Sequence, residues 1–363
     1  ISACLVGSEM CIRDRPGRTP IAVPPLKSSS VEATIEFPIG FAALAYRAPG
    51  STDPDFAASR VIAQVFQGQR NRFSDLVAEG KVLAGTSASN AFPEVGAHFL
   101  LAIPAQGTTP QATRDLLAGV VAEYRTNGIP SDLVEAAKTR LLGEQAFRQS
   151  SITGLGLAWA EAQAQSRATP DAIFESIAAV TTDDVNRVLR TYFTPEHQLA
   201  LVVTAKPSST TPKIDPSAGV ERLGFTPTVH QPLPAWAQIA LKAPLRAPTR
   251  DAGTVRGRLP SGLRYAVRRE TTAPAIVLSG VIRNAPELYE PKGKDGVNLI
   301  VAGLLPWGTT TYERKAYQGQ LDAIAASASL GTSFSLKVPA KDFERGLELL
   351  ADGMLPAFGP ASF

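Results

Sequence analysis

The chain has 363 residues, more than one compact core usually spans, so two domains are expected. It carries 36 Lys and Arg against 33 Asp and Glu, and this small net charge of +3 does not favour a nucleic-acid partner. Its apolar fraction of 44% suits a globular protein. No apolar run of about 18 residues is present, so no membrane span is expected.

The first 16 residues differ from the rest of the chain. Both cysteines, Cys4 and Cys11, lie in residues 1–16, a stretch that resembles the translated adapter read found at the edges of metagenomic gene sequences. We expect this tail to be non-native and to take no part in folding. Without it the chain has no cysteine for a disulfide, a thiolate zinc site or a nucleophile. Both ends of the chain look cut, so we expect a fragment of a longer protein.

Residues 17–206 are expected to form the first domain. Apolar and alternating patterns predict a pair of strands at 31–37 and 41–47, a helix over 53–69, a short helix that begins at Phe73 and stops at Gly80, and a hairpin of 84–92 with 95–103. Helical patterns then fill 109–193, where Thr181 and Asp184 have the spacing of a capping box. A strand follows at 197–205. This order predicts an α+β fold in which helices pack on an antiparallel sheet.

A proline-rich stretch, residues 207–252, is predicted to be a linker because it lacks the apolar periodicity of a folded segment. Residues 253–363 are expected to begin a second domain. There the patterns predict a new pair of strands at 262–268 and 275–283, helices from about 295 and over 312–326, a strand at 332–338 and a helix over 341–355.

The segment 296–309 carries a family resemblance. It fits without a gap the frame Gly-x-x-His-x-x-Glu-His followed by Gly-Thr, which is typical of the zinc helix in the pitrilysin/insulinase family of metallopeptidases, also called inverzincins. In that motif the two histidines bind zinc and the glutamate activates a zinc-bound water. Here Leu299 and Gly303 stand at the histidine positions and Ala302 at the glutamate position. We therefore expect this helix to bind no metal and to have no catalytic residues.

The resemblance implies a role for each part. Residues 17–206 resemble the non-catalytic second half of a peptidase unit, and residues 253–363 the truncated start of a second, degenerate unit. A zinc-bearing half is then expected upstream of residue 1. Zinc and a peptide substrate would belong to the intact parent, in which this chain forms part of the chamber wall and lacks its intramolecular partner halves. The family also points to the bacterial periplasm. The alternative is a non-catalytic structural or binding protein of the same fold.

Other patterns gave weaker hypotheses. An ordinary buried helix unrelated to peptidases would also explain 296–309. The three histidines, His98, His197 and His230, lack the spacing of helical ligands, so each is expected to be a surface or packed residue. Arg72 and Glu79 could contact a substrate, but a pair of helix-surface charges explains them more simply. Neither a nucleophile elbow nor a phosphate-binding loop is present in the sequence.

Overall fold

A computed structural model describes residues 23–24, 26–149, 151–165, 167, 169–206, 253–282, 290 and 292–354. The chain divides into two compact units, one made of Ile1–Lys206 with Ala273–Phe363 and the other of Pro207–Thr272. The expected tail at 1–16, the expected linker at 207–252 and His230 lie outside the described residues. The domain boundaries derived from the sequence therefore stay predictions.

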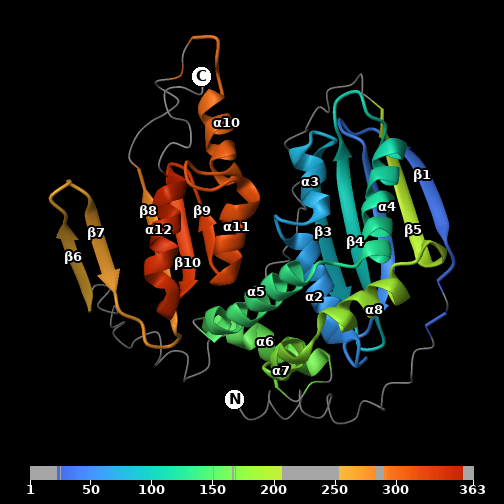
Figure 1. The fold of residues 1–363 in the computed structure, drawn as a ribbon, viewed down its shortest axis with the longest axis horizontal. Coiled ribbons are helices and arrows are strands. Elements are labelled where there is room, and N and C mark those ends of the chain that lie inside the picture. The colour runs from blue at the N-terminus through green and yellow to red at the C-terminus, as the bar shows by residue number, and fades with distance from the viewer. Residues whose placement is uncertain are drawn as a thin grey trace, which may run out of the picture. The chain divides into compact units, whose positions relative to one another are not determined.

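A five-stranded sheet is the centre of the first unit (Figure 1). Its order is β1 (Ser29–Ile35), β5 (Gln198–Ala205), β2 (Phe41–Pro49), β4 (Val95–Pro104) and β3 (Val82–Ala91). All neighbours are antiparallel except β1 and β5, which are parallel. The predicted β3–β4 hairpin is confirmed. The predicted pairing of the first two strands is wrong, because the more apolar β2 takes a central place between β4 and β5, whereas the largely exposed β1 lies at an edge.

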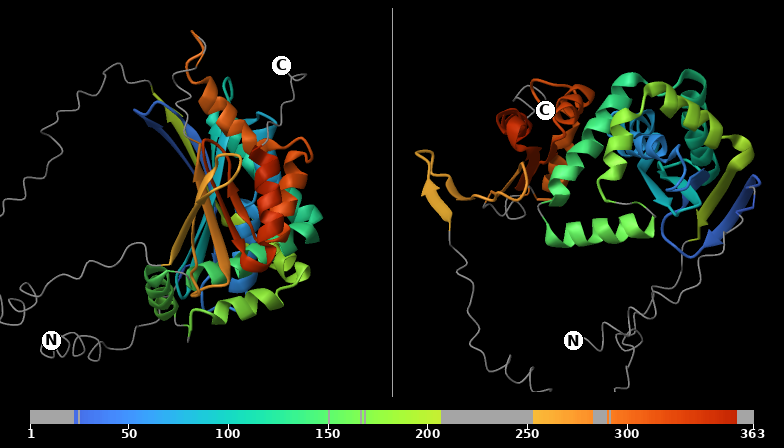
Figure 2. Two further views of the ribbon diagram at one scale, coloured as in Figure 1. Left: turned by 90° about the vertical axis from the view of Figure 1, so that its left-hand side faces the viewer. Right: turned by 90° about the horizontal axis from the view of Figure 1, so that it is seen from below.

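The α-helices described in this part of the chain connect and cover the strands. They are α2 (Phe56–Gln67), α3 (Arg72–Ala78), α4 (Pro110–Asn127), α5 (Ser131–Gln149), α6 (Ile152–Ala164), α7 (Ala172–Ala179) and α8 (Thr182–Tyr192). The side views in Figure 2 let the reader follow how helices cover one face of the sheet, and α2, α3, α4 and α8 make the contacts with the strands. Alternate residues of β2, such as Leu44 and Tyr46, are buried under them. We call residues 23–206 the five-stranded region.

Local signals in the sequence set several helix starts. The predicted capping box of α8 is confirmed, because the Asp184 amide donates to Thr181 Oγ1 and the Thr181 amide donates to the Asp184 carboxylate, each at 3.1 Å. Asn71 caps α3 by accepting from the Ser74 amide at 2.8 Å. Just beyond α3, Gly80 has a φ of 67°, a left-handed conformation that favours glycine.

The same unit contains a smaller sheet, which we call the three-stranded region (residues 273–354). Its order is β8 (Ala275–Val281), β10 (Ser333–Pro339) and β9 (Ser327–Ser329), all antiparallel. Its helices are α10 (Val297–Leu304), α11 (Arg314–Ala323) and α12 (Phe343–Met354), with the short 3₁₀ turn η3 (Leu305–Trp307) after α10. The helix expected over 312–326 ends early. Ala325 has a φ of 49°, and this turn sends the next residues into β9.

The second unit is described only as a hairpin of β6 (Thr254–Arg258) and β7 (Arg264–Arg268). The predicted pairing of 262–268 with 275–283 is therefore wrong, since β7 pairs with β6 and β8 pairs with β10. The reason is a tight turn in which Gly262, with a φ of 92°, donates its amide to the Leu259 carbonyl at 2.8 Å. The expected fold class is confirmed: helices pack on open, mainly antiparallel sheets.

Candidate functional site

The three positions of the zinc-motif frame lie on α10. The helix begins after Gly296, whose φ is 88° and whose amide donates to the Glu290 carboxylate at 2.8 Å. Ala302 is partly buried and Gly303 is exposed. A β-carbon at Gly303 would meet no atom within 4 Å. The helix predicted here is confirmed, while the assignment of Leu299, Ala302 and Gly303 as replaced zinc-site residues stays a prediction.

The described residues contain no group of three or more His, Cys, Asp or Glu side chains that could hold a metal ion. His98 is a packed residue on β4, where its Nε2 lies 2.8 Å from Ser59 Oγ and its ring lies against Phe193. Burial lowers the pKa of His98 to about 4, which keeps the imidazole neutral at pH 7. His197 is exposed and contacts Thr194. In the part of the chain that is described, no helix has the length and apolar character to cross a bilayer.

Arg72 and Glu79 belong to a surface network of charges. Arg72 Nη1 hydrogen-bonds Glu79, and its guanidinium also lies 3.4 Å from Glu123. Hydrogen bonds from Arg72 and then Lys81 lower the pKa of Glu79 to about 2. The ion pairs account for both charges, as the simpler interpretation of the sequence expected.

The free edge of β3 is the feature that sequence reasoning missed. In the five-stranded sheet β3 pairs with β4 on one side only. Residues 82–91 contain no charged residue and no proline, the devices that proteins use to protect an edge, and most of the strand is exposed. A register shift between Val82 and Ala84 is the one irregularity of its pairing with β4. Such an edge offers backbone amide and carbonyl groups to an added strand.

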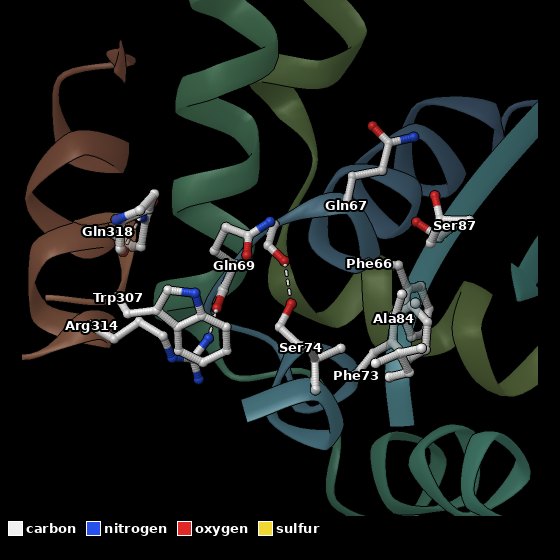
Figure 3. Close-up of a pocket in the computed structure, with 16 residues that line it drawn as sticks. Phe66, Gln67, Gln69, Phe73, Ser74, Ala84, Ser87, Trp307, Arg314 and Gln318 are labelled. Carbon is white, nitrogen blue, oxygen red and sulfur yellow. Dashed lines mark hydrogen bonds between the residues drawn. The ribbon is translucent and has the colours of Figure 1, made fainter. Parts of the chain in front are cut away.

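A pocket of about 390 Å³ lies beside the first half of this edge (Figure 3). We call it the β3 pocket. Its apolar lining comes from Phe66, Phe73 and Val77 in the five-stranded region and from Trp307 in the three-stranded region. A β-carbon on Gly85 would come within 2.6 Å of the Phe73 ring, so glycine lets that ring lie against the strand.

Hydrogen bonds fix two polar side chains of the β3 pocket, those of Arg314 and Ser74. Arg314 stacks over the Trp307 ring at 5.4 Å and donates to the Gln69 carbonyl at 2.8 Å and to Asp75 at 2.7 Å. Ser74 Oγ donates to the Gly68 carbonyl at 2.9 Å (Figure 3). Because these groups are already paired, the pocket suits an apolar side chain better than a charged one.

A second pocket, of about 320 Å³, lies beside the last residues of the same strand. We call it the end pocket. Ser89, Asn90 and Ala91 of β3 line it, together with Arg60 of α2 and Gln165, which follows α6. One free edge therefore has a pocket near each of its ends.

The sheet face opposite the helices is apolar as well. Side chains that alternate with the buried ones point away from the helices, and those of Val31, Phe99 and Leu199 are 55%, 38% and 38% exposed. Single exposed apolar residues are ordinary, but these three lie on three strands of one sheet face, β1, β5 and β4. Within the described residues this face is a wall of apolar side chains.

Comparisons with known proteins give the following results. No protein family model matches the sequence, and no curated protein matches it. Among solved structures, the chain is similar to a protease from Helicobacter pylori, with 14% identity and a TM-score of 0.48 over 53% of this chain and 48% of that one. It is also similar to a peptidase M16 inactive domain from Pseudomonas fluorescens, with 18% identity and a TM-score of 0.46 over 57% and 52%.

The periplasmic protease PqqL from Escherichia coli is a further similar structure, with 12% identity and a TM-score of 0.41 over 97% of this chain and 43% of that one. The chain thus spans about half the length, or less, of these three proteins.

Proposed function

We propose that this chain is a non-catalytic part of an M16-like zinc peptidase and that it binds peptides without cutting them. The zinc and the hydrolytic reaction would belong to another half of the parent protein, expected upstream of residue 1. The α+β fold supports this proposal, as does the frame at 296–309 with Leu299, Ala302 and Gly303 in place of the motif residues. By family resemblance, the parent would act in the bacterial periplasm.

The observation that carries the proposal is the free, uncharged edge of β3 beside the β3 pocket. An extended peptide can add to such an edge as a further strand. Its main-chain hydrogen bonds would give affinity for many sequences, and the pocket would prefer a peptide with one large apolar side chain. The exposed apolar face of the same sheet would form a wall beside the bound peptide, as the chamber-wall role requires.

Fluorescence polarisation with labelled, uncharged ten-residue peptides tests peptide binding directly. We expect a peptide with one Phe to bind about 10-fold more tightly than the same peptide with Ala at that position, because the ring fills the β3 pocket. Trp307→Ala should abolish this preference. Trp159→Ala, on α6 and outside the pocket, is the matched control and should retain it. Equal binding of both peptides to the wild-type chain would contradict the proposal.

Elemental analysis and a fluorogenic peptide assay test the non-catalytic part. After dialysis the chain should hold no stoichiometric zinc, and it should turn over no peptide beyond a mock purification. Amide hydrolysis at neutral pH needs a polarised water and a base, and the residues on α10 provide neither. Chelator-sensitive cleavage by the unmodified chain would refute this part of the proposal and leave the peptide-binding part standing.

A further inference from the structure

One side of β3 carries only small side chains along most of its length. The register with β4 shows which side this is, because it pairs every second residue of β3 with a buried residue of β4: Gly85 with Ala102, Ser87 with Leu100, Ser89 with His98 and Ala91 with Gly96. Paired residues of neighbouring strands point to the same face of a sheet. These four small residues therefore lie on the face that the helices cover.

Both pockets of the free edge reach this side of the strand. Gly85 and Ser87 line the β3 pocket, whereas Ser89 and Ala91 line the end pocket. The centres of these two pairs are about four residues apart, which corresponds to roughly 13 Å along a strand. The two pockets thus follow the same row of side chains.

Helix α2 lies along the same two pockets and runs in the opposite direction to β3. Phe66 and Gln67 of α2 line the β3 pocket, and Ser59 and Arg60 line the end pocket. These two positions are about seven residues apart, or roughly 10 Å on a helix. This distance agrees with the spacing along β3, so the two pockets are hollows along one line between the strand and the helix.

An extended peptide that pairs with the edge of β3 would meet both pockets. Successive side chains of a strand point to opposite faces, so side chains that are four residues apart point to the same face and can enter both pockets. Side chains three or five residues apart point to opposite faces. Antiparallel pairing is the more stable arrangement per residue. A peptide in this arrangement would reach the end pocket first and the β3 pocket four residues later.

Each pocket is lined by a residue with a buried oxygen that has no hydrogen-bond partner among the described residues. These atoms are Ser87 Oγ at the β3 pocket (Figure 3) and Gln165 Oε1 at the end pocket. A buried polar atom without a partner is costly. The Ser87 hydroxyl can donate or accept, so it does not select one kind of partner. Gln165 Nε2 donates to Glu161 at 3.2 Å, which leaves Gln165 Oε1 as an acceptor that lacks a donor.

The end pocket favours an uncharged donor. Arg60 and Glu161 both line it, so a charge of either sign would meet a like charge as well as an opposite one. The carboxamide group of a glutamine side chain has no charge and carries two N–H donors. Phe56 and Pro49 also line the pocket and can contact the methylene groups of such a side chain.

We propose that the edge of β3 selects two side chains of one peptide: a glutamine in the end pocket and, four residues later, a large apolar side chain in the β3 pocket. This inference rests on the proposed function, because it adds a second position to the same bound peptide. Gln165 is then a specificity-determining residue, whose Oε1 accepts a hydrogen bond from the amide of the peptide glutamine.

Fluorescence polarisation with uncharged, labelled ten-residue peptides tests this spacing. Each peptide contains one Phe, and a glutamine lies three, four or five positions before it. We expect the peptide with glutamine four positions before Phe to bind about 5-fold more tightly than the other two, and about 5-fold more tightly than the same peptide with methionine at that position. Equal binding of the three glutamine peptides would overturn the inference, while a preference for Phe over Ala would leave the proposed function standing.

Two variants of the chain test the role of Gln165. Gln165→Leu should reduce the glutamine-to-methionine ratio to near one, yet it should still bind the Phe peptide more tightly than the Ala peptide, which shows that the fold is intact. Gln163→Leu, at an exposed position of α6, is the matched control and should leave both ratios unchanged. A glutamine preference that survives Gln165→Leu would overturn the inference.

A peptide with the glutamine four positions after Phe tests the direction of the added strand. It should bind no better than its methionine counterpart, and a preference for this order alone would overturn the antiparallel direction. If the wild-type chain does not distinguish Phe from Ala, the proposed function fails and this inference fails with it.

Discussion

The five-stranded and three-stranded regions are stabilised in different ways. The core of the five-stranded region is large and joins β2, β4 and β5 to helices α2, α4, α5, α7 and α8. The core of the three-stranded region consists of Tyr317, Leu321, Ala326, Leu330, Leu336, Val338, Leu349 and Leu350. Because hydrophobic stabilisation grows with the buried apolar area, the smaller sheet needs additional support.

Ion pairs to the five-stranded region give part of that support. Asp322 of α11 is 6% exposed and accepts a hydrogen bond from Arg140 of α5 at 3.1 Å. Arg314 and Lys315 of α11 each reach Asp75 of α3 at 2.7 Å. Burial raises the pKa of Asp322, and Arg140 and Arg70 act against that rise. A small core is thus joined to a large one through buried charges, whose removal is costly only when one partner is left unpaired.

The largest expected effect distinguishes the two cores. Leu44→Ala in β2 and Leu336→Ala in β10 both empty a fully buried site, and each should cost about 3–5 kcal/mol of local stability. Hydrogen exchange read by mass spectrometry should show loss of protection throughout the unit for Leu44→Ala. For Leu336→Ala the loss should be confined to residues 273–354. Equal loss of protection in both regions for both variants would mean that the two cores unfold as one.

The next largest expected effect is a dependence of stability on pH, and it concerns the five-stranded region because His98 lies on β4. The pKa of His98 falls from 6.5 to about 4 on folding, so the unfolded chain binds the extra proton between these pH values. Titration of His98 therefore leaves the free energy of unfolding at its highest value above pH 6.5. As the pH falls towards 4, this free energy decreases by up to about 3 kcal/mol. His98→Gln keeps a hydrogen-bonding group near Ser59. In this variant the urea concentration at the unfolding midpoint should change little with pH over this range. An unchanged pH slope in the variant would contradict the assignment.

A smaller effect concerns the junction between the regions. Asp322→Asn removes the buried anion that Arg140 and Arg70 face, and it should lower the stability of the three-stranded region by about 2 kcal/mol. Asp132→Asn is the matched control, because Asp132 also pairs with Arg70 but its side chain is 60% exposed. That change should cost less than about 0.5 kcal/mol. Equal losses measured in urea would show that burial of the carboxylate is unimportant.

Features that depend on residues close together in the sequence were predicted correctly. The β3–β4 hairpin, the helix at α10 and the capping box of Thr181 and Asp184 depend on neighbouring residues, and the structure contains all three. The pairing of strands that are adjacent in the sequence was predicted wrongly, because β1 and β2 do not pair with each other and both pair with the distant β5. The strands β6 and β9 were missed because each has at most five residues and a weak pattern.

The candidate site was predictable only in part. The frame at 296–309 placed Leu299, Ala302 and Gly303 on one helix, since a motif is a local pattern. The β3 pocket combines Phe73 with Trp307, and only the tertiary fold brings such distant residues together. One signal was available in the sequence: a ten-residue strand without charge or proline is unusual at a sheet edge.

The smallest expected effect concerns α10, which contrasts with both cores. This helix is strongly apolar, yet Ile300 is 64%, Leu304 42% and Val301 39% exposed. A side chain that folding does not bury contributes little to stability, so Ile300→Gln should change the free energy of unfolding by less than about 0.5 kcal/mol. The same substitution at Ile62, which is 0% exposed, puts an unpaired amide into the large core and should cost several times more. Urea unfolding of the two variants measures this difference. A loss above about 1 kcal/mol for Ile300→Gln would show that α10 is part of the stabilising core.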